Sequence, residues 1–126
     1  MGYNVLIADD SLIMRKMVAK TLRISDIDID EFFFAENGRE ALEQLGENRV
    51  DIVFAEINMP EMNGIEMIEE MRKKEPLSSI PVVVISTERS RERIERLKAM
   101  GVKSYLCKPF IPEQFTRVAK NLLRQD

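Results

Sequence analysis

The sequence contains no histidine and only one cysteine, Cys107. Without imidazole there is no His general base, no Ser-His triad and no His-ligated zinc site. A single cysteine cannot form a disulfide within the chain, which favours a reducing, cytoplasmic setting. No stretch of about 18 apolar residues is present, so a membrane-spanning helix is excluded. Residues 1–4 also lack the basic start of a signal peptide.

Charge is abundant and unevenly distributed. Charged residues make up 33% of the 126 residues and apolar residues 44%, which is typical of a soluble globular protein with one domain, here residues 1–126. The net charge is −3, yet residues 26–70 hold fourteen acids and two bases, whereas residues 71–126 hold six acids and thirteen bases. The division indicates either two solvated faces of opposite sign or docking surfaces for oppositely charged partners.

Apolar, β-branched runs alternate with amphipathic segments along the chain. The runs predict strands at Tyr3–Ala8, Glu31–Ala35, Ile52–Glu56, Pro81–Ser86 and Lys103–Cys107. The segments between them predict helices at Leu12–Ile24, Arg39–Glu47, residues 64–75, Ser90–Met100 and Glu113–Leu123. Such alternation implies a parallel sheet covered on both faces. We therefore expect an α/β fold, a flavodoxin-like (βα)5 three-layer sandwich with strand order 2-1-3-4-5.

The helix patterns also predict which side chains face the core. In the first expected helix the inward set follows i, i+3, i+4 spacing and comprises Met14, Met17, Val18, Thr21 and Leu22. Arg15 is expected on the opposite side, and Arg72 is expected in solvent on the third helix. Ser11 and Ser90 can act as N-caps. Gly101 is expected to end the fourth helix as a C′ glycine.

Polar residues stand at the carboxyl ends of four of the five expected strands. They are Asp9 and Asp10, Glu56, Ser86 and Thr87, and Lys108 and Pro109. In a parallel sheet these positions share one edge. Converging carboxylates need a cation, which Lys108 or an oxygen-ligated Mg²⁺ could supply. Taken singly, the same residues have simpler interpretations: turn and cap chemistry, a satisfied hydroxyl and a solvated lysine.

Seven elements occur in the order of a known family. They are Leu6–Ser11, Asn37–Leu42, Asp51–Val53, Asn58–Gly64, Pro81–Ser86, Gly101 and Tyr105–Phe110, within a match over nearly all of residues 3–123. With them the whole chain resembles a CheY-like receiver domain of two-component response regulators. Each motif is weak alone, and the ordered set is highly specific. The resemblance implies a chemotaxis-type or phosphorelay signalling domain.

The resemblance also implies roles for the strand-end residues. Asp10 would bind Mg²⁺ directly and Asp9 through water, with Glu56 and the main-chain carbonyl of Asn58 completing the ligand set. Ser86 would contact a phosphoryl group, with Thr87 next to it, and Lys108 would pair with the phosphate. Pro109 would follow Lys108, often through a cis peptide bond. Tyr105 would be the aromatic side chain that turns inward on activation.

Position 56 departs from the family pattern, because Glu56 stands where the family has the phosphoacceptor Asp. Its extra methylene moves the carboxylate outward by about 1.5 Å. Phosphoryl transfer depends on in-line positioning, so this shift is expected to slow it greatly. The longer side chain could instead hydrogen-bond Ser86 or pair with Lys108. As a phosphate mimic it is incomplete, since it offers one charge and two oxygens.

Three interpretations stay open. The preferred one is a phosphorylation-independent receiver, a binding module that Glu56 fixes in an active-like or intermediate state, and not an enzyme. The second is a Mg²⁺-dependent receiver that accepts phosphate inefficiently on Glu56, or one whose Asp was replaced deliberately. The third is a Mg²⁺-dependent phosphatase-like enzyme of the same topology, which is disfavoured because such enzymes use an Asp nucleophile.

The resemblance places the output surface on the fourth helix, fifth strand and fifth helix. Residues 89–103 in this region hold six bases against two acids, which indicates either a solvated helix or a site for an acidic protein partner. We expect no output domain after residue 126 and therefore output by protein contact in trans, from a monomer, with a sensor histidine kinase upstream. Nucleic-acid binding is not expected, because one short basic helix lacks stacking aromatics and a groove.

Overall fold

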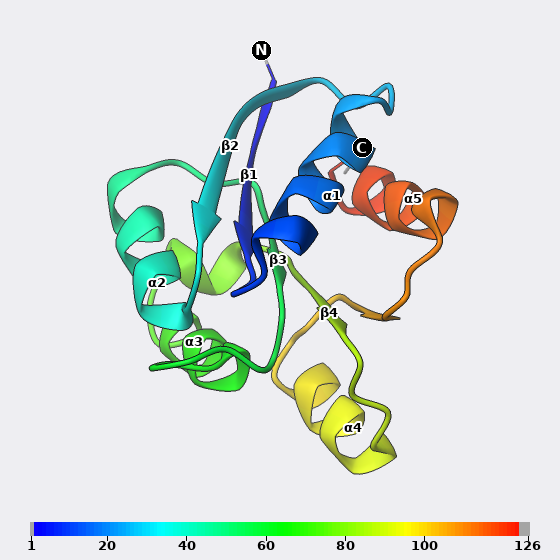
Figure 1. The fold of residues 1–126 in the computed structure, drawn as a ribbon. Coiled ribbons are helices and arrows are strands. Elements are labelled where there is room, and N and C mark those ends of the chain that lie inside the picture. The colour runs from blue at the N-terminus through cyan, green and yellow to red at the C-terminus, as the bar shows by residue number, and fades with distance from the viewer. Residues whose placement is uncertain (1, 124–126) are drawn as a thin grey trace.

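Five parallel strands form one sheet between two layers of helices in a computed structural model, which describes residues 2–123 (Figure 1). In chain order the elements are β1 (Tyr3–Ala8), α1 (Leu12–Arg23), β2 (Ile29–Ala35), α2 (Gly38–Glu47), β3 (Ile52–Ala55), α3 (Gly64–Met71), the 3₁₀ helix η1 (Leu77–Ser79), β4 (Val82–Ser86), α4 (Arg91–Ala99), β5 (Ser104–Cys107) and α5 (Pro112–Leu123). The order β2-β1-β3-β4-β5 confirms the expected flavodoxin-like topology. The prediction of one domain over residues 1–126 extends to Met1 and residues 124–126, outside the described part, and stays a prediction.

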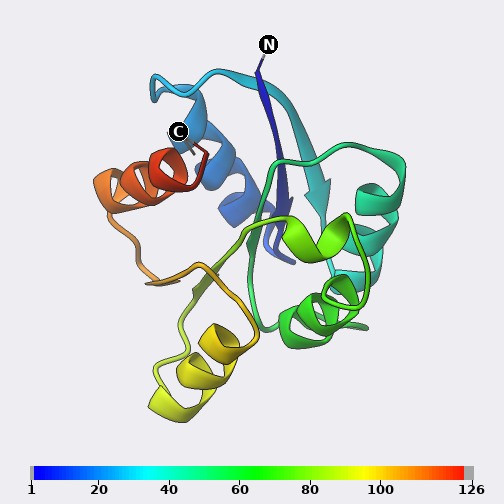
Figure 2. The ribbon, with the colours of Figure 1, turned by 180° about the vertical axis from the view of Figure 1, so that it is seen from behind.

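The two helical layers bury different residues of the same strands. Val5 and Phe54 face the layer of α1 and α5, where the Phe54 and Phe115 ring centroids are 4.7 Å apart. Leu6 and Val53 face the opposite side, which α2 and α3 cover (Figures 1 and 2). Because neighbouring residues of a strand point to opposite faces, each central strand is apolar throughout and contributes to both cores.

Helix α1 buries Val18 and Leu22 as expected, but its buried face is rotated toward Arg15 and Ala19. Its buried residues are Arg15, Val18, Ala19 and Leu22. Met14 and Thr21 are only half-buried, and Met17 is 49% exposed. The placement of Arg15 in solvent was therefore wrong. The reason is a polar partner: its guanidinium donates a 2.6 Å hydrogen bond to the main-chain carbonyl of Asp9.

Helix α3 ends at Met71, four residues earlier than expected, and Arg72 is its C-cap. Arg72 is half-buried, so its placement in solvent was also wrong. Strand β2 begins at Ile29, within a stretch expected to be a loop, because Ile29 pairs with Tyr3 of β1. Within residues 2–123 no helix has the length and apolar character needed to cross a bilayer.

Side chains and backbone conformations at several helix ends match the expectations. The Ser11 side chain accepts from the Met14 amide at α1, and the Ser90 side chain accepts from the Arg93 amide at α4. Gly101 has φ +92°, the left-handed conformation expected of a glycine that follows a helix. The two serine caps mark where the loops at the carboxyl edge of the sheet end and their helices begin, whereas Gly101 lies at the opposite edge, in the turn before β5.

Candidate functional site

The register of the sheet brings four strand ends to one edge. Ala8 of β1 pairs with Ala55 of β3, and Ser86 of β4 pairs with Cys107 of β5. The residues that follow these pairs therefore start their loops at about the same level. Asp9, Glu56 and Lys108 meet there, as the sequence predicted.

Lys108 joins the two acidic side chains of this edge. Its amine donates a 2.6 Å hydrogen bond to Glu56 Oε1 and a 3.2 Å hydrogen bond to Asp9 Oδ2. Asp9 and Glu56 are buried, and Lys108 is half-buried. Burial alone would lower the pKa of Lys108, but the hydrogen bond to Glu56 and the charges of both acids raise it above its ordinary value. One fixed cation thus bridges two strand-end carboxylates.

Both oxygens of Glu56 have partners. Oε1 accepts from Lys108, whereas Oε2 accepts from the main-chain amides of Ile57 at 2.7 Å and Asn58 at 3.2 Å. Burial would raise the pKa of Glu56, but hydrogen bonds from Lys108, Ser86 and the Asn58 amide outweigh it and hold the pKa below the ordinary value. The carboxylate is therefore ionised and turned back over the end of its own strand.

Asp9 is fixed by its own loop. Its Oδ1 accepts from the Ser11 amide at 2.9 Å, and its main-chain carbonyl accepts from buried Arg15. Burial raises the pKa of Asp9, and the hydrogen bonds from Ser11 and Lys108 offset this only in part. Sequence reasoning missed Arg15 in the site. The signal was its position one turn before Val18 and two before Leu22, on the buried stripe of α1.

The predicted magnesium ligands do not gather as a set. Asp10 and Asn58 are exposed, whereas Asp9 and Glu56 are buried and bonded to Lys108. Among residues 2–123 no three acidic, histidine or cysteine side chains surround one point as a metal site would require. The oxygen-only donors suit Mg²⁺ chemically, but in this structure Asp9 and Glu56 are bonded to Lys108 instead of being arranged around a shared point. The ligand assignment stays a prediction.

Ser86 and the expected switch residues Thr87, Tyr105 and Pro109 belong to β4, β5 and the residues directly after these strands. Ser86 is fully buried and accepts from the Glu88 amide at 3.3 Å, while Thr87 is exposed. The hydroxyl of half-buried Tyr105 donates to the main-chain carbonyl of Glu88. The peptide bond before Pro109 is cis. Ser86 therefore borders the carboxylates, and Tyr105 ties the start of the β4–α4 loop to β5.

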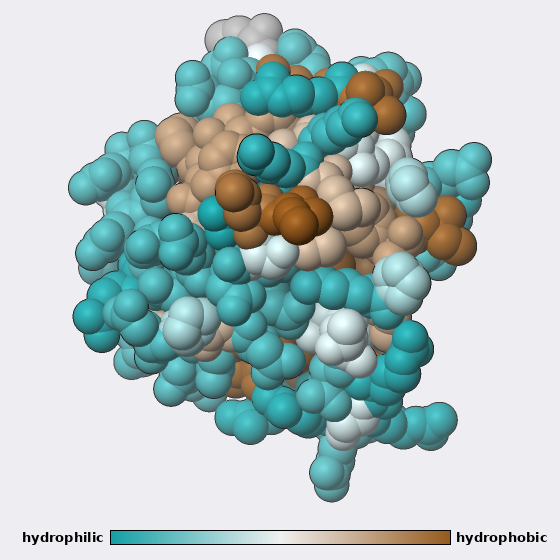
Figure 3. All heavy atoms as spheres, in the orientation of Figure 1, coloured by the Kyte–Doolittle hydropathy of each residue, from teal (hydrophilic) through white to brown (hydrophobic). Residues whose placement is uncertain are grey.

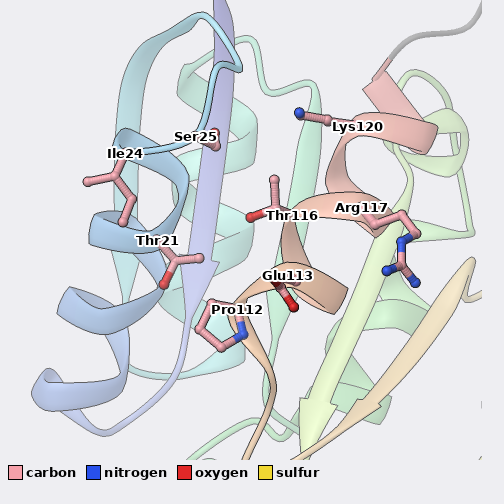
Figure 4. A pocket seen from close by; sticks show the side chains of 8 residues that line it. All are labelled: Thr21, Ile24, Ser25, Pro112, Glu113, Thr116, Arg117 and Lys120. Atoms are coloured by element: carbon pink, nitrogen blue, oxygen red, sulfur yellow. The ribbon is translucent and has the colours of Figure 1, made fainter.

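Two cavities flank helix α1. One of about 390 Å³ is bordered by Met14, Met17, Thr87, Lys108, Pro109 and Phe110. It lies beside the strand-end cluster, and exposed Leu12, Ile13 and Met17 give α1 an apolar amino-terminal end (Figure 3). The other, about 440 Å³, lies between α1 and α5 (Figure 4). None of the strand-end residues borders it, so it is separate from the site.

Helix α4 carries most of the predicted basic segment. Arg93 pairs with Glu88 at 3.2 Å, and Arg96 pairs with Glu69 of α3 at 3.4 Å. Arg89, Arg91, Lys98 and Lys103 are exposed. The basic charge of this segment therefore lies at the surface.

A protein family model and several known proteins match this chain over most of its length. The family model of the response regulator receiver domain matches residues 5–120. The chain is 38% identical to the chemotaxis protein CheY1 of Helicobacter pylori over 112 residues, which covers 87% of this chain and 88% of that protein. It is 35% identical to the chemotaxis protein CheY homolog of Campylobacter jejuni over 122 residues, which covers 95% and 92%.

A solved structure agrees in fold. The chemotaxis protein CheY4 of Vibrio cholerae superimposes with a TM-score of 0.86 at 32% identity, over 98% of this chain and all of that one. The chain spans most of the length of each of these proteins, so the likeness concerns the whole domain rather than one motif.

Proposed function

The chain belongs to the response regulator receiver family, and we propose that it relays a two-component or chemotaxis-type signal by protein contact without phosphorylation of Glu56. Receiver domains are signalling modules that act through protein partners, and generally not enzymes. The main support for this proposal is that both carboxylate oxygens of Glu56 accept hydrogen bonds, one from Lys108 and the other from two main-chain amides.

Phosphoryl transfer would require a free, aligned carboxylate oxygen at position 56. Glu56 Oε1 is 2.6 Å from Lys108, and only 6% of Glu56 is exposed. To attack, Oε1 would have to break its charge-assisted hydrogen bond to Lys108, or Oε2 would have to leave its two main-chain amides, and either loss opposes the reaction. The second candidate, slow phosphoryl acceptance on Glu56, requires that rearrangement.

The Glu56–Lys108 pair also supports a fixed state of the site. In the proposed mechanism Lys108 holds the negative charge of Glu56 beside buried Ser86. By the family resemblance, Ser86 is the residue that would contact a phosphoryl group, so the Glu56 carboxylate occupies the place of a phosphoryl oxygen. Hydrogen bonds from Lys108 and Ser86 to Glu56 hold its pKa down, against burial, and keep the carboxylate charged. The charge is smaller than that of a phosphoryl group, so the state held is intermediate between unmodified and phosphorylated.

Magnesium is a separate part of the proposal. Receiver domains in general bind Mg²⁺, and in this chain Asp10, Asp9, Glu56 and the Asn58 carbonyl are the proposed ligands. Lys108 competes with the ion for Asp9 and Glu56, which it bonds directly. We expect weak binding, with exposed Asp10 as the main contact.

The proposed output surface comprises α4, β5 and α5, and its partner presents an acidic surface. The exposed arginines and lysines of α4 support this choice, because they can steer and orient an oppositely charged protein. A sensor histidine kinase is the proposed upstream partner, and the domain is proposed to act as a monomer.

A phosphodonor experiment tests the proposed function. The purified chain is incubated with Mg²⁺ and acetyl phosphate, and intact mass is measured beside Glu56→Asp and Glu56→Gln variants. We expect no phosphoryl gain on the natural chain or on Glu56→Gln, and a gain on Glu56→Asp, which restores the shorter carboxylate. A base-labile phosphoryl group on Glu56 of the natural chain would instead support the phosphoacceptor function.

A further inference from the structure

Arg72 connects three segments of the chain through one guanidinium group. Its Nε donates to the Met100 carbonyl at 3.0 Å and its Nη2 to the Gly101 carbonyl at 3.3 Å. Its Nη1 donates to the Ser78 carbonyl at 3.2 Å and to the Ile80 carbonyl at 3.5 Å. The C-cap of α3 is thereby bonded to η1, to the residue before Pro81 and to the turn between α4 and β5.

The contacts at Met100 and Gly101 lie at the carboxyl end of α4, where the last carbonyls of a helix lack partners and carry partial negative charge. Met100 is the C-cap of α4, and Gly101 follows with φ +92°. A Cβ at Gly101 would lie 3.2 Å from Arg72 Nε, which shows how closely the guanidinium approaches this turn. Arg72 thus supplies a cation and directed donors at the helix end.

Helix α4 buries fewer apolar side chains than the other α-helices. Leu97 is its only buried residue, while its other side chains are mostly charged. Figures 1 and 2 show α4 set apart from the other helices, at the end of the sheet below β4. At its amino end, the Glu88 carboxylate accepts from the Ser90 amide and pairs with Arg93, and Tyr105 bonds the Glu88 carbonyl. Directed polar contacts therefore fix both ends of this helix.

We propose that Arg72 is the positioning residue that fixes the carboxyl end of α4 and so holds the basic side chains of that helix in one arrangement for an acidic protein partner. This inference rests on the proposed function for its partner. The fixing of α4 itself is a property of the free chain. Without Arg72, Leu97 and the contacts around Glu88 remain, so α4 would pivot about its amino end.

Amide hydrogen exchange of the whole chain tests this role in the absence of any partner. Arg72→Met keeps the aliphatic length and removes all donors, whereas Arg72→Lys keeps the charge. Lys73→Met is the matched control, because Lys73 is exposed, follows Arg72 directly and pairs with Glu70 of α3 instead of with α4. For Arg72→Met we expect exchange at residues 91–103 to rise about tenfold, as charge-assisted hydrogen bonds of ordinary strength predict. Exchange in α1, α2 and α5 should stay within about twofold.

Two further variants, Arg72→Lys and Lys73→Met, distinguish a positioning role of Arg72 from a general contribution to stability. Arg72→Lys should show an intermediate effect on residues 91–103, and Lys73→Met should show none. Unchanged exchange in α4 of Arg72→Met would overturn the proposal, as would an equal rise in every helix, which marks an ordinary stabilising residue. Because the readout needs neither phosphate nor partner, the proposed function could fail in the phosphodonor experiment while this inference stands.

Discussion

The side-chain amine of Lys108 lies 2.6 Å from Glu56 Oε1, although the two residues are 52 positions apart in the chain. Their relative exposures are 17% for the Lys108 side chain and 7% for that of Glu56. Charge-assisted hydrogen bonds of this length in a buried setting are strong, and removing one partner leaves an uncompensated charge. Removing one partner alone should therefore destabilise the domain, and the pair fixes the geometry of the site.

Lys108→Met should destabilise the domain because it leaves Glu56 and Asp9 buried without their cation. We expect a loss of about 2–4 kcal/mol in the free energy of unfolding, measured by urea denaturation. Lys103→Met, at an exposed lysine just before β5 and at the opposite edge of the sheet, should change it by less than about 0.5 kcal/mol. Adding Glu56→Gln to Lys108→Met should recover part of the loss. A Lys108→Met variant as stable as the Lys103→Met control would contradict the pairing.

Magnesium affinity should depend on the competition between the ion and Lys108. Glu56→Asp shortens the acid, weakens its 2.6 Å contact with Lys108 and releases a carboxylate toward exposed Asp10. We expect Mg²⁺ to bind Glu56→Asp about tenfold more tightly than the natural chain in calorimetric titration, a difference of roughly 1.4 kcal/mol. Asp10→Asn should remove most binding in both. Equal affinities for the natural chain and Glu56→Asp would show that Lys108 does not compete.

Much of the fold follows from short-range patterns in the sequence. The apolar runs predict all five strands, and the serine caps and Gly101 define helix ends, because propensity and capping act over a few residues. Ile29 of β2 was missed since its strand pairing with Tyr3 is a long-range property that alternating acids conceal. The early end of α3 at Met71 was missed for a similar reason: Arg72 finds its partners in distant segments.

For the site, too, the sequence predicts which residues share an edge of the sheet but not the individual contacts that their side chains make. Parallel topology predicts that Asp9, Glu56 and Lys108 share an edge, and the structure brings them together. Topology does not predict that the Glu56 carboxylate turns back onto the amide of Ile57, because that contact depends on side-chain rotamers and loop conformation. Arg15 was assigned to solvent because a charged residue on an amphipathic helix usually lies there.

Tyr105 should titrate at unusually high pH. Burial raises its pKa above the ordinary value of 10.0, with hydrogen bonding to Ser86 acting in the opposite direction. Because the folded state favours the neutral phenol, this contribution to stability is complete below pH 10.0 and is lost as pH rises through the folded-state pKa. Ultraviolet titration of the natural chain against Tyr105→Phe isolates Tyr105 from Tyr3. A midpoint for Tyr105 at or below 10.0 would refute the burial argument.

Gly64 controls the loop that carries Glu56 into the site. A Cβ at Gly64 would lie 2.4 Å from the Glu56 carbonyl oxygen, and the Gly64 amide donates to the Ile57 carbonyl at 2.8 Å. Gly64→Ala must therefore displace the backbone of Glu56, which we expect to cost about 1–3 kcal/mol in the free energy of unfolding.

The matched control is Gly46→Ala near the end of α2, where a Cβ would meet nothing within 4 Å. Alanine loses less backbone entropy than glycine on entering a helix, so this variant should be stabilised by about 0.5 kcal/mol. The two alanine variants thus differ in sign, although the chemical change is the same. If urea denaturation gave both the same sign, the close approach at Gly64 would not explain its effect. A selective change at Gly64 should also shift the amide resonances of Ile57 and Asn58, because both amides donate to the Glu56 carboxylate that the displaced backbone carries.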